Sequence, residues 1–218
     1  MLIDAVIFDM DGTLIDSMWM WGSIDERFLR ERGFEVPDGL QKIIEGCSIH
    51  ETAVWFIENY NLPETPEELC DIWTNMAIDA YKNDVKPKVG AMEFLKKLKE
   101  LGIKTAIASS NTTDLIETTL ESCGLAPYID VYFSGCMIKC GKPAPDIYLE
   151  AAKALGVKPE RCLCFEDIVK GLQAGKAAGM TCACIKDDYC LDKPEDIAAL
   201  ADYRFDDFYE AFALITDR

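Results

Sequence analysis

The 218-residue sequence has very little histidine, little positive charge and no long apolar run. Its single histidine, His50, excludes a metal site built from several histidines and allows a Ser-His-Asp triad only if His50 itself is the base. Arginine and lysine total 22 against 39 acidic residues, and the net charge of −17 disfavours binding to nucleic acid or to an anionic membrane. No apolar run approaches the roughly 18 residues of a membrane span. A signal-peptide pattern is also absent from the N-terminus, so we expect a cytoplasmic protein.

Cysteine is plentiful instead, with ten residues, but its pattern predicts neither disulfides nor zinc. In a reducing compartment free thiols are the default. Two C-x-C pairs stand in the apolar runs 161–165 and 180–185, where alternation places both members of a pair on one strand face. Such cysteines act as small buried hydrophobic residues. Cys136 and Cys140 lack the second cysteine pair or the histidines of a zinc site.

The sequence does contain a regular alternation of short apolar runs with amphipathic segments. The expected strands are 3–8, 103–108, 130–134, 161–165 and 180–185. Apolar residues at helical spacing predict helices over 91–102, 112–124, 146–156 and 171–179. This order indicates an α/β fold with a parallel, Rossmann-like sheet buried on both faces. In the last helix, glycines 171, 175 and 179 indicate close packing and a helix stop, not a nucleotide loop.

Residues 17–83 interrupt this alternation. They contain four helical patterns, at about 17–32, 38–45, 49–60 and 66–82, with no strand between them, and they hold all four tryptophans. We therefore expect an all-helical cap domain at 17–83, inserted into a discontinuous α/β core domain formed by 1–16 and 84–218. The tail, YRFDDFYEAFALI, predicts a short strand and a closing helix.

Polar and charged side chains follow the expected strands. They are Asp9 and Asp11 after the first strand, Ser109, Ser110 and Asn111 after the second, Lys142 after the third, and Glu166 with Asp167 after the fourth. Ligands of open α/β sheets bind beyond the carboxyl ends of the strands, so we expect these residues to converge. Carboxylates with few other ligands suit Mg²⁺, and a cation would hold two like charges one residue apart.

Four motifs at these strand ends resemble those of the haloacid dehalogenase superfamily. They are DMDGTLIDS, the serine that closes TAIAS, the lysine of GKPAPD, and FED. The helical insertion after the first motif is similar to the cap of the β-phosphoglucomutase and phosphoglycolate phosphatase-like branch. The resemblance covers almost the whole chain and implies an enzyme with a Rossmann-like core.

The resemblance implies a Mg²⁺-dependent phosphatase that hydrolyses a small phosphate monoester. Asp9 would attack phosphorus to form an aspartyl-phosphate, and Asp11 would protonate the leaving oxygen and then activate water. A dehalogenase expels halide without a proton and lacks the second aspartate, so Asp11 favours phosphate esters.

The other motif residues would hold the metal and the phosphoryl group. The implied metal site comprises Asp9, the Asp11 carbonyl, Asp167 and, through water, Glu166; the implied phosphate site comprises Ser109, Ser110, Asn111 and Lys142. Gly12 would let the chain turn closely past the site, and Thr13 would brace that loop.

A sugar phosphate mutase of the β-phosphoglucomutase type is the alternative function. That branch has a histidine and an arginine where this chain has Trp21 and Ile49, so the polar side chains that bind the sugar and its second phosphate are missing. Lys42 or Lys82 could supply a positive charge for that phosphate instead. Trp21 and His50 are candidate substrate contacts. A phospho-receiver or a non-enzymatic interaction protein is a remote alternative. The expected partner is a small phosphorylated metabolite, bound by a monomer or, alternatively, a dimer.

Overall fold

The main sheet has six strands in the order β5-β4-β1-β6-β7-β8, and neighbouring strands are parallel. The computed structural model of the protein describes residues 3–44 and 47–216. The strands are β1 (Ala5–Phe8), β4 (Lys104–Ser109), β5 (Val131–Ser134), β6 (Cys162–Glu166), β7 (Thr181–Ile185) and β8 (Tyr203–Phe205). The predicted α/β fold with a parallel sheet is therefore confirmed.

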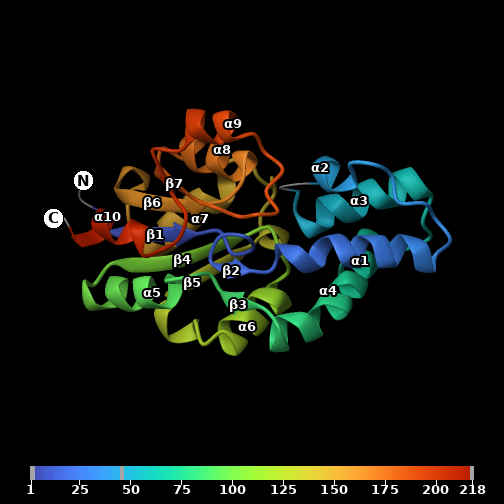
Figure 1. The fold of residues 1–218 in the computed structure, drawn as a ribbon, viewed down its shortest axis with the longest axis horizontal. Coiled ribbons are helices and arrows are strands. Elements are labelled where there is room, and N and C mark those ends of the chain that lie inside the picture. The colour runs from blue at the N-terminus through green and yellow to red at the C-terminus, as the bar shows by residue number, and fades with distance from the viewer. Residues whose placement is uncertain (1–2, 45–46, 217–218) are drawn as a thin grey trace.

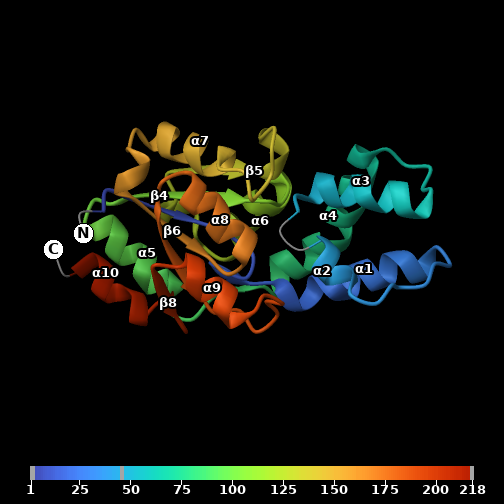
Figure 2. The ribbon, with the colours of Figure 1, turned by 90° about the horizontal axis from the view of Figure 1, so that it is seen from above.

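Helices cover both faces of this sheet (Figures 1 and 2). One face packs against α5 (Ala91–Glu100), α6 (Thr113–Ser122) and α10 (Ala213–Thr216). The other packs against α7 (Asp146–Leu155) and α8 (Val169–Ala177), with α9 (Pro194–Leu200) beside α8. Short 3₁₀ turns are η1 (Ala126–Tyr128), η2 (Gly135–Met137), η3 (Pro159–Arg161) and η4 (Glu210–Phe212). Helix α9 was not expected, because its seven residues are too few to show a clear helical periodicity.

The cysteines of the sheet allow α8 to pack closely. Both C-x-C pairs are buried on the face that α7 and α8 cover, as the alternation predicts. A Cβ added at Gly175 would lie 2.7 Å from the Cys182 sulfur and 2.9 Å from the Cys164 sulfur, so only glycine fits there. None of the ten cysteines, all of which lie within the described residues, forms a disulfide, and Cys136 and Cys140 are exposed.

Four helices lie beyond the carboxyl ends of the strands, at the right of Figure 1. They are α1 (Met18–Glu31), α2 (Leu40–Ile44), α3 (Ile49–Tyr60) and α4 (Pro66–Asn83). Capping boxes begin α3 at Ser48 and α4 at Thr65. Phe28, Phe56 and Trp73 pack edge to face between these helices. None of the helices within 3–44 and 47–216 is long and apolar enough to cross a bilayer.

The chain enters and leaves this helical group at a single place. β2 (Ile15–Asp16) pairs antiparallel with β3 (Lys86–Pro87), so the outgoing and returning segments lie side by side. Two-residue strands are too short to show a periodicity, and the sequence did not predict them. Helices α1–α4 are thus joined to the sheet through a paired two-stranded connection.

Candidate active site

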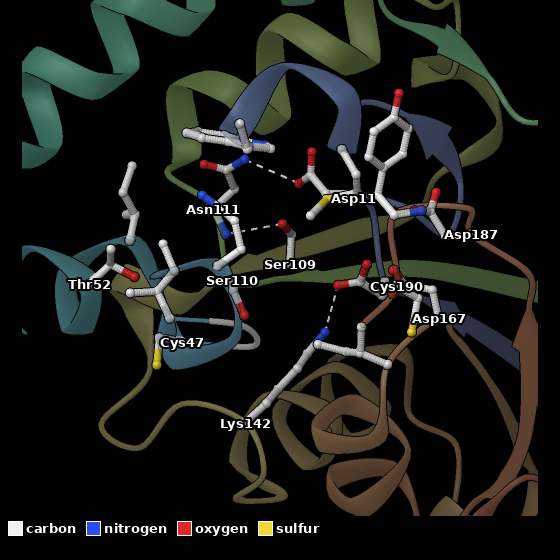
Figure 3. A pocket seen from close by; sticks show the side chains of 18 of the residues that line it. Asp11, Cys47, Thr52, Ser109, Ser110, Asn111, Lys142, Asp167, Asp187 and Cys190 are labelled. Carbon is white, nitrogen blue, oxygen red and sulfur yellow. Dashed lines mark hydrogen bonds and ion pairs between the residues drawn. The ribbon is translucent and has the colours of Figure 1, made fainter. Parts of the chain in front are cut away.

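Parallel register brings the predicted residues to one edge of the sheet. Phe8 of β1 lies opposite Ile107 of β4 and Phe165 of β6. Asp9 and Glu166, the next residues along β1 and β6, therefore lie side by side. The Asp9 N–H donates to the Phe165 carbonyl at 2.9 Å. A cavity between the sheet edge and helices α1–α4 is lined by Asp9, Asp11, Ser109, Ser110, Asn111, Lys142, Asp167 and Trp21 (Figure 3).

Lys142 bridges two carboxylates of this edge. Its ammonium lies 2.6 Å from Asp9 Oδ1 and 2.6 Å from Glu166 Oε1. The Tyr148 hydroxyl also donates to Glu166 Oε1. Burial raises the pKa of Asp9 to about 7; Lys142 opposes this shift and Glu166 adds to it. Burial alone would lower the pKa of Lys142, but the charges of Asp9 and Glu166 raise it overall, so Lys142 is a cation.

Three buried carboxylates form a group that fits a divalent cation. Ligand atoms of Asp9, Glu166 and Asp167 all lie within 4.8 Å of one another. Burial, followed by the charges of Asp9 and Glu166, raises the pKa of Asp167 well above its usual range. Glu166 Oε2 is buried without a hydrogen-bond partner among the described atoms. One lysine cannot balance three carboxylates, and oxygen ligands of this kind are those that Mg²⁺ takes.

The loop after β1 is shaped by Asp167. Gly12 has φ +79°, and a Cβ there would lie 2.2 Å from Asp167 Oδ2. The Thr13 hydroxyl donates to Asp167 Oδ1 at 3.1 Å. A glycine is therefore required both for the backbone conformation and for the close approach to the carboxylate.

The Asp11 carboxylate faces away from this group and toward the helices. Oδ1 accepts from the Ser17 hydroxyl at 2.7 Å and from the Tyr81 hydroxyl, and Oδ2 accepts from Asn111 Nδ2 at 3.1 Å. The Trp21 indole donates in turn to the Tyr81 hydroxyl at 3.2 Å. The contact made by Tyr81 was not predicted, because no local pattern indicates that a residue of α4 reaches the end of β1.

The loop after β4 supplies hydroxyl and amide groups. Ser109 Oγ accepts from the Asn111 N–H at 3.1 Å. The Ser110 carbonyl accepts from the Ile49 N–H of α3 at 3.3 Å, which is a direct bond between the helical group and the sheet edge. His50, next to Ile49, does not line the cavity; it lies on the surface, 3.5 Å from Glu67.

One further carboxylate at this edge was missed. Asp187 follows β7, lines the cavity and forms a 2.6 Å ion pair with Lys88. The strand-end rule that identified Asp9 and Asp167 would have found Asp187, had it been applied to the strand at 180–185. Figure 3 shows Asp187 and Cys190 across the cavity from Cys47 and Thr52 of the helical group.

Known proteins share this sequence pattern and architecture. Residues 3–179 match the sequence model of a family described as haloacid dehalogenase-like hydrolase. The bifunctional riboflavin kinase/FMN phosphatase of Arabidopsis thaliana is 34% identical over 180 residues, 82% of this chain, which spans about half (47%) of that relative. The phosphorylated carbohydrates phosphatase of Thermotoga maritima is 30% identical over 178 residues, 82% of either chain.

The crystal structure of CbbY from Rhodobacter sphaeroides in complex with phosphate superposes with a TM-score of 0.85, at 25% identity and over 96% of both chains. The family match covers most of the present chain, and the curated relatives support it. The resemblance inferred from the four motifs is therefore confirmed, and the chain belongs to the haloacid dehalogenase-like hydrolase family.

Proposed function

We propose that the protein hydrolyses a small phosphate monoester through an aspartyl-phosphate on Asp9. The carrying observation is that Asp9 and Asp11 line one cavity with Lys142, which contacts Asp9 at 2.6 Å. Both curated relatives described above have phosphatase in their names, and the CbbY structure holds phosphate. The predicted enzyme class, a phosphoric monoester hydrolase of this family, agrees with these relatives.

The chemistry follows from the two aspartates. An Asp9 carboxylate oxygen attacks phosphorus, the bond from phosphorus to the leaving oxygen breaks, and Asp11 gives that oxygen a proton. Water then attacks the phosphorus of the aspartyl-phosphate, Asp11 takes a proton from the water, and inorganic phosphate leaves with Asp9 restored. Asp11 must turn from its partners Ser17 and Tyr81 to reach the leaving oxygen.

The remaining motif residues bind the charged phosphoryl group. Asp9, Asp167 and the Asp11 carbonyl would hold Mg²⁺, with Glu166 assisting through water, and the bound cation would supply positive charge beside the phosphoryl oxygens. Ser109, Ser110, Asn111 and Lys142 would bind those oxygens by hydrogen bonds and charge. Lys142 is buried and therefore acts in a low-dielectric environment, where its charge has a larger effect.

Helices α1–α4 would act as a cap domain at 17–83 that closes the cavity over the substrate. The bond from Ile49 N–H to the Ser110 carbonyl joins this cap to the core, 1–16 and 84–218. Closure would exclude water from the cavity before transfer. Among the described residues of the cap, no cationic side chain lines the cavity: Lys42 pairs with Asp192 at 2.6 Å, and Lys82 is not a lining residue.

Release of phosphate from a panel of monoesters, with Mg²⁺ present, tests this proposal. We expect inorganic phosphate from at least one small ester. In a second assay, β-glucose 1-phosphate with a trace of glucose 1,6-bisphosphate should yield little glucose 6-phosphate, since Lys142 is the one cation among the described residues that line the cavity. Rapid glucose 6-phosphate formation with little free phosphate would instead establish a mutase.

Replacing Gly171 by alanine should reduce kcat/KM on the order of 100-fold, the scale expected for a displacement of about 1 Å in an active site. A Cβ at Gly171 would lie 2.0 Å from Glu166 Cδ, so the Glu166 side chain, which contacts Lys142, must shift. Steady-state kinetics on the best ester and thermal unfolding provide the measurement. Gly124→Ala is the control: its Cβ meets nothing within 4 Å, but φ +66° imposes backbone strain. Loss of stability without loss of activity is expected there, and wild-type activity in Gly171→Ala would contradict the geometry.

A further inference from the structure

One buried acidic side chain of the cap is not used by the proposed chemistry. Asp25 of α1 lines the cap side of the cavity and is only 5% exposed. Its Oδ2 accepts a 2.8 Å hydrogen bond from Gln41 Nε2 of α2, which lines the same wall. The surrounding cap wall is mostly apolar and comprises Met18, Trp21, Ile44, Ile49 and Trp73. In pockets for small ligands, a few polar groups on a mostly apolar wall fix the orientation of the ligand.

The Asp25 carboxylate can accept more hydrogen bonds than it does in this structure. Within the described residues, the bond from Gln41 is its one hydrogen bond, and no cation pairs with it. Burial raises the pKa of Asp25 to about 6, a shift that the Gln41 bond opposes, so the group is ionised above that pH. An ionised carboxylate only accepts hydrogen bonds. The cap wall therefore presents unused acceptor sites to whatever enters the cavity.

The charge around the cavity is almost entirely negative. Lys142 is the only cationic side chain among the described residues that line it, and it is already bound to Asp9 and Glu166. The acidic lining residues are Asp9, Asp11, Asp25, Asp167 and Asp187. A second negative group on the substrate, held at the cap end, would meet Asp25 without a counter-charge, and like charges brought together in this way are strongly unfavourable.

We propose that Asp25, held in place by Gln41, is a specificity-determining residue that accepts hydrogen bonds from hydroxyl groups of the leaving alcohol and excludes leaving groups with a second negative charge. The inference rests on the proposed phosphatase function, but it concerns the cap side of the cavity and not the transfer step. It identifies the substrate as a phosphate monoester of an uncharged, hydroxylated alcohol, and it makes phosphorylated carboxylic acids and bisphosphates poor substrates.

Two phosphate esters of nearly equal size separate these classes. sn-Glycerol 3-phosphate and 3-phosphoglycerate share a three-carbon skeleton, but a CH₂OH group of the first is a carboxylate in the second. We expect the wild-type kcat/KM to favour glycerol 3-phosphate by at least about 100-fold, because a site that hydrogen-bonds a hydroxyl discriminates strongly. A wild-type enzyme that hydrolyses both esters equally well would overturn the proposal, whatever the variants do.

Asp25→Asn should lower that preference at least about tenfold. The asparagine amide carries no negative charge to repel the carboxylate of 3-phosphoglycerate, and its N–H groups can donate hydrogen bonds to that carboxylate. Asp38→Asn is the matched control, because Asp38 is an exposed cap residue that does not line the cavity. The control should keep the wild-type ratio. An unchanged ratio in Asp25→Asn, with folding verified by thermal unfolding, would also overturn the assignment.

Hydrolysis of p-nitrophenyl phosphate separates a failure of the proposed phosphatase function from a failure of the role assigned to Asp25. This ester has an activated leaving group with no hydroxyl, so its hydrolysis reports on phosphoryl transfer without the hydrogen bond assigned to Asp25. If the wild-type protein with Mg²⁺ releases no phosphate from these three esters or from any other ester of the panel described above, the proposed function itself fails. If it hydrolyses p-nitrophenyl phosphate but does not distinguish the two three-carbon esters, only the role of Asp25 fails.

Discussion

Asp9→Asn should reduce turnover by at least about 10⁴-fold on the best ester, because an amide oxygen is a poor nucleophile and loss of a nucleophile removes the whole covalent route. The fold should persist. Asp9 is buried, and replacing a carboxylate whose pKa is raised by burial with a neutral amide removes an unfavourable charge. The measurement is phosphate release under single-turnover and steady-state conditions, with thermal unfolding recorded for each protein.

Asp16→Asn provides the matched control. Asp16 belongs to the same motif but is exposed in β2 and does not line the cavity. It should retain activity within about threefold, as is usual for a surface substitution. An Asp9→Asn protein that is correctly folded and retains more than about a hundredth of wild-type turnover would exclude Asp9 as the nucleophile.

Metal removal is expected to have an effect of similar size. Activity should be lost after treatment with EDTA and return with excess Mg²⁺, whereas Zn²⁺ should restore it poorly at a site made of oxygen ligands. The basis is the buried group of Asp9, Glu166 and Asp167, which has one lysine to balance three carboxylates. Full activity in a thoroughly demetallated sample would contradict the prediction.

Mg²⁺ should also raise the melting temperature, because it binds the folded protein alone. A raised carboxyl pKa means that the folded state binds more protons than the unfolded state between the two pKa values. For Asp9, with a folded pKa of about 7, the metal-free protein therefore loses stability as the pH rises from about 4 to 7. The shift caused by Mg²⁺ should accordingly be larger at pH 8 than at pH 5.5, and Asp167→Asn should reduce it.

The alternation of apolar runs and amphipathic segments was sufficient to predict the sheet. Each of the five strands predicted from an apolar run appears within two residues of its expected bounds. A strand buried on both faces needs a continuous apolar run, and such a run can be recognised in the sequence. The convergence of Asp9, Lys142 and Asp167 also followed from the sequence. Parallel strands end at the same edge, so the residues after each strand are brought together by topology alone. Helices α1–α4 were predicted by the same periodicity.

The tertiary structure decided which side chains meet across that edge. Tyr81 reaches Asp11 from a helix 70 residues further along the chain, and Gln41 of α2 reaches Asp25 of α1. Neither contact has a local signature, since both depend on how helices α1–α4 pack against one another and against the sheet edge.

The β2–β3 pair could likewise not be predicted from the sequence, because a strand of two residues is too short to show a periodicity. Periodicity and strand order therefore determined the fold and the edge of the sheet at which the candidate site residues meet. Helix packing, which depends on side-chain shape over long sequence separations, determined the cap wall that we infer selects the substrate.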